Sequence, residues 1–193
     1  METWPQIREW RAGERRRLIA ARMAFRGAAR QRCDRAITAA LSQLVPPGVP
    51  VGFYWPIRGE PDLRGFVSGL LDHGARLALP VVVEKKAPVE FRAWRPDAPM
   101  ASGIWDIPVP AGGERMRPEV LLVPLVGFDE RCYRLGYGAG YYDRTLAALP
   151  RETLAIGVGY ELSHLRTVYP QPHDVPMSII VTEARVIRRS SHT

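Results

Sequence analysis

The sequence predicts an α/β protein: a single three-layer α/β/α domain spanning residues 1–193, with a mostly parallel sheet preceded by two N-terminal helices. Three observations predict this fold class. Short apolar runs that suit buried strands alternate with segments of helical periodicity. Breaks containing proline or glycine separate these segments. A length of 193 residues is enough to bury one substantial core without disulfides or a structural metal.

The two predicted N-terminal helices span residues 5–23 and 25–44. The second has an apolar stripe with spacings of three and four, which is typical of a helix packed on a core. It ends before a Pro-Pro-Gly turn at 46–48. A strand at 49–55 and a helix at 62–73 follow, and together they predict the first strand–helix unit.

The middle of the chain contains two further predicted strands. Residues 76–83 form a nearly continuous apolar run that suits a central strand, whereas residues 89–94 alternate as an edge or hairpin strand does. The proline-rich segment 95–118 predicts an irregular loop.

The remaining elements surround a glycine-rich connection. A buried strand is predicted at 120–123 and a helix at 141–149, which Pro150 stops. Another strand is predicted at 154–160, and the last strand of the sheet at 179–182.

The glycine-rich connection leads from the strand at 120–123 to the helix at 141–149. It has glycines at alternate positions, which are Gly136, Gly138 and Gly140. Glycine allows positive φ and a close approach of backbone N–H groups to an anion, and a helix N-terminus adds a favourable dipole. Arg134 precedes the loop and Asp143 lies in the first helical turn. This arrangement indicates a nucleotide phosphate with Mg²⁺ beside it, and the alternative is a tight turn that glycine merely permits.

The positive charge is concentrated near the N-terminus. The formal net charge is +7, and residues 8–35 hold ten arginines against three acidic residues. Such a run can be a solvated helix face, a polyanion site, or a source of phosphate ligands. Arg11 and Arg15 lie one turn apart on the same helix face. A nucleic-acid-binding module that uses these helices stays an alternative, although few aromatic residues for base stacking lie among the arginines, so nucleic acid is not the expected partner.

The cysteines and the hydropathy pattern favour a cytoplasmic protein. Cys33 and Cys132 form neither a CxxC pair nor a Cys/His cluster, so they predict neither a disulfide framework nor a zinc site. No run approaches the roughly 18–20 apolar residues that span a bilayer, so no membrane partner is expected.

The glycine-rich connection resembles the signature of 5-formyltetrahydrofolate cyclo-ligases, also called 5,10-methenyltetrahydrofolate synthetases. The matching residues are Phe128-Asp129, Arg134-Leu135-Gly136, Gly138 and Gly140-Tyr141-Tyr142-Asp143. Other segments resemble the same family, namely Tyr54-Trp55-Pro56 with Gly59-Glu60-Pro61-Asp62, the segment Trp105 to Pro110, and Asp174. The resemblance extends over about residues 7–183.

The resemblance implies ATP- and Mg²⁺-dependent conversion of 5-formyltetrahydrofolate to 5,10-methenyltetrahydrofolate, with release of ADP and phosphate. It implies no nucleophilic side chain, and phosphoryl positioning by Arg134 and Tyr142. The implied ATP-binding residues are Arg11, Arg15, Arg134, Leu135, Gly136, Tyr137, Gly138, Ala139, Gly140, Tyr141 and Tyr142. The implied substrate-binding residues are Trp55, Glu60, Trp105, Tyr137, Gly138, Ala139, Gly140 and Tyr141. The implied metal ligands are Asp143 and Asp174.

Two of these residues also have simpler interpretations. Glu60 could supply negative charge to the N-terminus of the helix at 62–73. Trp105 could be a packing residue, because its large apolar area usually dominates its role.

The chain departs from the family pattern at four positions, which are Arg11, Tyr137, Ala139 and Ser178. At Tyr137 and Ala139 the loop has no cationic side chain. An alternative is therefore a diverged paralogue that binds ATP and a folate-like ligand but has a different or weak activity.

Overall fold

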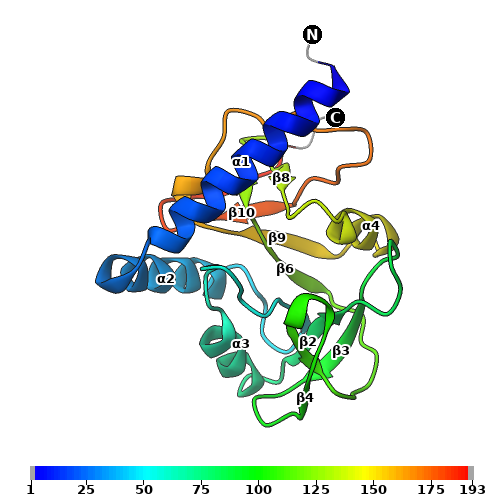
Figure 1. Ribbon diagram of the computed structural model, residues 1–193. Helices are drawn as coiled ribbons and strands as arrows, with labels where there is room; N and C mark the ends of the chain where they lie inside the picture. The colour runs from blue at the N-terminus through cyan, green and yellow to red at the C-terminus, as the bar shows by residue number, and fades with distance from the viewer. Residues whose placement is uncertain (1–2, 191–193) are drawn as a thin grey trace.

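A seven-stranded sheet organises the molecule (Figure 1). The structure is a computed structural model that describes residues 3–190. The strand order is β11-β10-β9-β6-β1-β2-β3. The strands are β1 (Pro50–Gly52), β2 (Arg76–Val81), β3 (Glu90–Trp94), β6 (Val120–Pro124), β9 (Leu154–Val158), β10 (Ile179–Val181) and β11 (Val186–Arg188). The five inner strands pair in parallel, and the two edge strands, β3 and β11, are antiparallel to their neighbours.

Helices cover both faces of the sheet, which confirms the three-layer prediction. The helices are α1 (Trp4–Ala24), α2 (Gly27–Ser42), α3 (Arg64–Leu71) and α4 (Tyr141–Ala148). On one face, α2 and α3 contribute Ile37, Leu41 and Val67 to a core shared with the strands. Helix α4 covers the other face (Figure 1). Its Tyr142 and Leu146 pack against a second core. Alternating strand side chains thus enter different layers, as a buried parallel sheet requires.

Helix α1 lies outside these layers and packs against loops at the carboxyl ends of the strands. Leu18 of α1 is buried with Val126 and Leu135, which follow β6, and with Leu165 and Val168, which follow β9. The helix is thereby placed beside the loops that leave the sheet at this edge.

The sheet has a topological switch point between β1 and β6. The chain passes from β1 to β2 on one side, while β6 occupies the other side of β1. Loops from the carboxyl ends of these two strands therefore leave in opposite directions, and such a switch point is where open α/β sheets bind ligands. Glu60 is in the loop after β1 and the glycine-rich connection follows β6.

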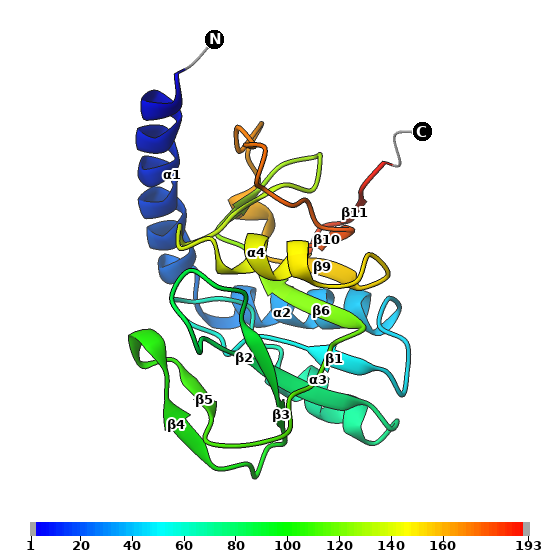
Figure 2. The same cartoon turned by 90° about the vertical axis from the view of Figure 1, so that its right-hand side faces the viewer.

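Two predicted features of the secondary structure were wrong. The predicted irregular loop at 95–118 contains the hairpin β4 (Met100–Ser102) and β5 (Pro108–Pro110), with a 3-10 turn, η1 (Ile104–Asp106), between the strands (Figure 2). Proline is tolerated in such an edge pair, so its presence did not exclude strands. Residues 179–182 are not the last strand, because β11 follows.

A second small pair lies within the glycine-rich connection, namely β7 (Gly127–Phe128) and β8 (Arg134–Leu135). The strand predicted at 154–160 ends at Val158, and a short 3-10 turn, η2 (Glu161–Ser163), comes soon after it. Within residues 3–190, none of the helices combines the length and the hydropathy that crossing a membrane would require.

Candidate active site

Four segments meet at the switch point. Helix α1 contributes Arg11 and Arg15, the loop after β1 contributes Glu60, the connection after β6 contributes the glycine loop, and the segment after β9 contributes Asp174. We use the term glycine loop for residues 136–140.

Glu60 is buried and directly joined to the glycine loop. Its side chain is only 1% exposed. One carboxylate oxygen, Oε2, accepts the Ile57 backbone N–H at 2.9 Å, and Oε1 accepts the Tyr137 hydroxyl at 2.7 Å. Burial raises the pKa of Glu60, and these two hydrogen bonds oppose that shift. Because α3 begins only at Arg64, these contacts favour a site role for Glu60 over a helix-terminal charge.

Arg22 was missed by the sequence-based prediction and occupies the centre of this region. It is 1% exposed and donates to the Leu125 carbonyl and to the Tyr137 hydroxyl, each at 2.7 Å. Its Nη2 lies 3.8 Å from Glu60 Oε1. Arg11, Arg15 and Arg22 recur at spacings of four and seven on one face of α1, and that spacing was the available signal.

The glycine loop follows a path that its glycines permit. Gly138 and Gly140 have φ of +98° and +69°, in the left-handed region that side chains rarely adopt. A Cβ atom on Gly138 would lie 3.4 Å from the Arg15 guanidinium carbon. Arg15 also donates to the Gly136 carbonyl at 2.7 Å, and its partial burial together with the Arg11 charge lowers its pKa. Arg15 therefore lies directly against the loop.

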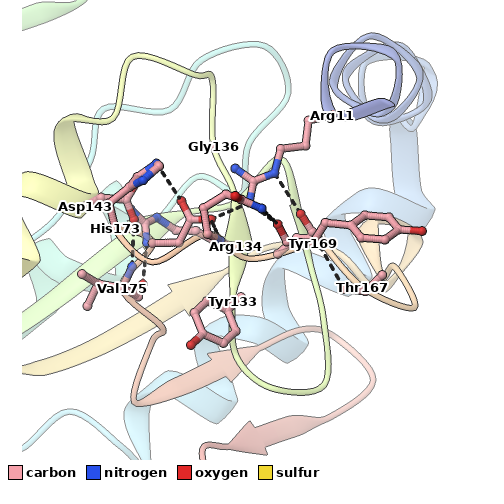
Figure 3. Close-up of polar contacts among 12 residues, drawn as sticks. Arg11, Tyr133, Arg134, Gly136, Asp143, Thr167, Tyr169, His173 and Val175 are labelled. Carbon is pink, nitrogen blue, oxygen red and sulfur yellow. Dashed lines mark hydrogen bonds and ion pairs between the residues drawn. The ribbon is translucent and has the colours of Figure 1, made fainter. Parts of the chain in front are cut away.

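Arg134 and Asp143 clamp the backbone next to Asp174. The Arg134 Nη2 atom lies 2.9 Å from Asp143 Oδ1. Arg134 donates to the Val175 carbonyl, and Asp143 accepts the Val175 N–H, at 2.9 and 3.1 Å. The predicted phosphate ligand and the predicted metal ligand are thus an ion pair in this structure (Figure 3).

Arg11 forms a matching pair with Asp174. Its Nη2 donates to Asp174 Oδ2 at 2.5 Å, and its other contacts are the carbonyls of Val168 and Tyr169 (Figure 3). Both Arg11 and Asp174 have side chains less than 10% exposed. Asp174 also accepts the Gln171 N–H at 2.8 Å.

The two carboxylates fit a magnesium ion. In the described part of the chain, no three His, Cys, Asp or Glu side chains gather as a complete metal cage. Mg²⁺ usually keeps several waters and is held by one or two carboxylates together with substrate phosphates. Asp143, in the first turn of α4, and Asp174, in the segment after β9, carry hard oxygen atoms of that type.

Of the aromatic residues implied by the resemblance, Trp105 and Tyr142 lie next to Tyr141 and Arg134, whereas Trp55 lies apart from them. Trp105 is 66% exposed, with φ of 58°, and its ring lies 6.0 Å from that of Tyr141 at the start of α4, so it is not a core packing residue. Tyr142 lies with its ring 6.0 Å from the Arg134 guanidinium carbon, and burial raises its pKa. Trp55 lies elsewhere, under the Arg64 guanidinium at 4.7 Å in a shallow hollow.

Asp129 is a second residue whose importance the structure reveals. It is 1% exposed, and its carboxylate accepts the N–H groups of Arg131, Tyr133 and Val168 at 3.0 to 3.2 Å. The side chain therefore ties the segment that carries Arg134 to the segment that carries Asp174.

The N-terminal arginines are not simply a solvated face. Arg11 and Arg22 are buried, Arg15 contacts the glycine loop, and Arg30 of α2 donates to the Glu60 carbonyl at 2.9 Å. Part of the concentrated positive charge thus serves internal contacts around the candidate site.

Comparisons with known proteins identify relatives of this chain. The model of the 5-formyltetrahydrofolate cyclo-ligase family matches residues 7–183. The chain is 34% identical to the 5-formyltetrahydrofolate cyclo-ligase of Mycolicibacterium smegmatis over 180 residues, which cover 88% of this chain and 92% of that protein. It is 29% identical to the Escherichia coli K12 protein of the same name, over 70% of this chain and 79% of that one.

Solved structures share the fold. The Aquifex aeolicus 5,10-methenyltetrahydrofolate synthetase superposes with a TM-score of 0.81 at 30% identity, over 95% of both chains. The corresponding synthetase of Mycoplasma pneumoniae has a TM-score of 0.75 at 24% identity, over 90% of this chain and 98% of that one. With a family model that matches nearly the whole sequence, the chain belongs to the 5-formyltetrahydrofolate cyclo-ligase family.

Proposed function

We propose that this chain binds 5-formyltetrahydrofolate and ATP at the switch point, with Mg²⁺ between the phosphates and Asp143 and Asp174, and forms 5,10-methenyltetrahydrofolate. As a family member it is a 5-formyltetrahydrofolate cyclo-ligase, an ATP-dependent ligase. The observation that carries the residue assignment is the direct hydrogen bond between Glu60 and Tyr137 of the glycine loop. This bond places Glu60, the residue proposed to bind folate, and the glycine loop, proposed to bind the phosphates, in one site.

The reaction asks the protein mainly for positioning and charge neutralisation. The formyl oxygen takes the γ-phosphoryl group of ATP, N10 attacks the activated formyl carbon and loses its proton, and phosphate leaves. Holding the two substrates in the orientation in which they react supplies much of the rate enhancement in reactions of this kind. No nucleophilic side chain is needed, and none is proposed.

Glu60 would orient the folate. Its buried carboxylate can accept N–H groups of a pterin ring, and such charge-assisted bonds are each worth about 1.5–3 kcal/mol. The exposed Trp105 and the half-buried Tyr141, whose rings are neighbours at the start of α4, would contact the planar substrate. Trp55 stays in the proposal as a more remote substrate contact.

The glycine loop would hold the phosphates. Arg15 lies against Gly138, and the backbone of residues 135–140 with Tyr142 completes the proposed ATP site. Arg11 and Arg134 would contribute by exchanging part of their contact with Asp174 and Asp143 for phosphate oxygens. Mg²⁺, when bound, would neutralise phosphate charge beside those two carboxylates.

The test is the absorbance of the methenyl product. Purified protein is incubated with 5-formyltetrahydrofolate and Mg²⁺, with and without ATP, and we expect the chromophore only with ATP. Glu60→Gln, which should bind 5-formyltetrahydrofolate more weakly, is the matched control: its absorbance signal should be lower if the signal depends on bound folate. Binding of both ligands without turnover would contradict the proposal and favour a diverged paralogue. A tight RNA affinity that falls steeply with salt would favour the nucleic-acid alternative.

We also propose a cytoplasmic location. Cys33 and Cys132 are free thiols, as is usual in a reducing compartment.

A further inference from the structure

We propose that Arg144 of α4 is a phosphate-binding residue that gives the glycine loop the positive charge its own side chains lack. This inference rests on the proposed function, in which the loop binds the phosphates of ATP. It adds a residue outside the set that the resemblance implied.

Arg144 folds back from the first turn of α4 onto the loop. Its Nη2 donates to the Ala139 carbonyl at 2.6 Å. Its Nη1 lies 2.9 Å from the point that a Cβ atom on Gly140 would occupy. The guanidinium carbon lies 5.3 Å from the centre of the Tyr141 ring. The charge is therefore held above the end of the loop that leads into the helix.

The charge of Arg144 is not neutralised. Arg11 and Arg134 are paired with Asp174 and Asp143, so much of their charge is already balanced. Throughout residues 3–190, no carboxylate lies within ion-pair distance of Arg144, whose remaining partners are a backbone carbonyl and an aromatic ring. An anion that enters the loop would meet this guanidinium as an unpaired cation.

The hydrogen-bonding capacity of Arg144 is also mostly unused. A guanidinium has five N–H groups, and Arg144 donates one of them within the described chain. Its Nε is buried and has no acceptor there. Buried donors are normally satisfied, so an unused one at a ligand loop indicates a partner that is absent from the protein itself. Phosphate oxygens match the planar fork of arginine.

Two arginines then frame the loop from opposite ends. Arg15 bonds the Gly136 carbonyl and lies against Gly138, and Arg144 bonds the Ala139 carbonyl and lies against Gly140. The lack of cationic side chains at Tyr137 and Ala139 is compensated by residues that reach in from α1 and α4. ATP binding by this chain therefore does not require a basic residue inside the loop.

The test compares Arg144→Gln and Arg144→Lys with the matched control Arg151→Gln. Arg151 is an exposed arginine that follows α4. Calorimetry would measure the Kd for ATP, ADP, AMP and adenosine. We expect Arg144→Gln to weaken ATP binding by about 10- to 100-fold, as loss of a charged hydrogen bond does. Adenosine binding should change by less than about threefold, because it has no phosphate to contact the guanidinium. Arg144→Lys should lie between wild type and Arg144→Gln, because it keeps the charge and loses the fork.

Two outcomes would overturn the inference. One is wild-type ATP affinity in Arg144→Gln. The other is an equal loss of affinity for ATP and adenosine, which would indicate a structural role under Tyr141. Thermal melting and the Kd for 5-formyltetrahydrofolate, both expected to be unchanged, control for misfolding.

Failure of the inference can be told apart from failure of the proposed function. If the wild type forms methenyl product while Arg144→Gln binds ATP normally, only the Arg144 assignment fails. If the wild type forms no product, and Arg144→Gln binds ATP more weakly than the wild type while binding adenosine equally well, the reaction assignment fails and Arg144 remains a phosphate ligand.

Discussion

The hydroxyl of Tyr137 connects two buried charges, and its removal is the sharpest test of the site's construction. It donates to Glu60 Oε1 and accepts from Arg22 Nη2, both at 2.7 Å. Tyr137→Phe deletes one oxygen and leaves the ring in place. Two charged groups, each 1% exposed, then lose a hydrogen-bond partner in a region that water reaches poorly.

The expected loss of stability follows from these contacts. Hydrogen bonds to charged groups contribute about 1.5–3 kcal/mol each, and the two are coupled, so they do not add fully. Arg22 and Glu60 are 3.8 Å apart and can approach each other in the variant, which offsets part of the loss. We expect a net destabilisation of about 2–4 kcal/mol. For a chain of this size that lowers the Tm by about 4–16 °C.

The effect should depend on pH, because it acts through Glu60. Burial raises the pKa of Glu60, and the Tyr137 hydroxyl lowers it, so Tyr137→Phe raises that pKa further. A carboxylate whose folded pKa lies above its unfolded pKa loses stability as pH rises through the folded pKa. The difference in free energy of unfolding between wild type and Tyr137→Phe should therefore be smaller at acid pH, where mainly the Arg22 hydrogen bond is lost, and should widen as Glu60 ionises.

Thermal melting by circular dichroism at about pH 5 and pH 8 would measure this difference. Tyr133→Phe is the matched control, because among the described residues its hydroxyl has no hydrogen-bond partner and its side chain packs against the core cluster that contains Leu18 and Leu135. A Tm for Tyr137→Phe within a degree of wild type would refute the reasoning. So would a difference that grows toward acid pH.

Three further substitutions test the remaining assignments. Glu60→Gln should weaken 5-formyltetrahydrofolate binding by about tenfold or more and leave ATP binding nearly unchanged, measured by calorimetry; a loss of thermal stability alone would contradict this. Asp174→Asn should raise the Mg²⁺ concentration needed for half-maximal activity, because a charged hard ligand becomes neutral; an unaltered Mg²⁺ titration would remove it from the metal site. Arg134→Ala should weaken ATP binding by about 10- to 100-fold, and an unchanged Kd would leave Arg134 as only the partner of Asp143.

Local patterns predicted the layers of the fold well. The stripe of α2 and the apolar runs of β2, β6 and β9 are set by burial against neighbours, and burial leaves a period in the sequence. The hairpin of β4 and β5 was missed because its proline content is typical of loops, and β11 because a three-residue, partly exposed edge strand has little apolar signal. These short strands are defined by backbone pairing with a neighbouring segment rather than by their own composition.

The candidate site was predictable where a motif is contiguous. Arg134, the alternating glycines and Asp143 lie within ten residues of one another, and the structure places them together. Arg22 was not predicted although it shares a helix face with Arg11 and Arg15, because arginines crowd that helix. Arg144 was not predicted because only the fold shows that it turns back onto the glycine loop. The bond between Glu60 and Tyr137 joins positions 77 residues apart, and no local spacing indicates it.

The contacts of α1 also determine when the site can exist during synthesis. Arg11 bonds Asp174, which is 163 residues later in the chain, and Arg22 bonds Tyr137, which is 115 residues later. Helix α1 therefore waits for segments made much later in the chain before Arg11 and Arg22 find these acceptors. A ribosome-bound chain stalled before Asp174 would display Arg11 on this helix without its carboxylate partner, so the proposed nucleotide site would still be incomplete.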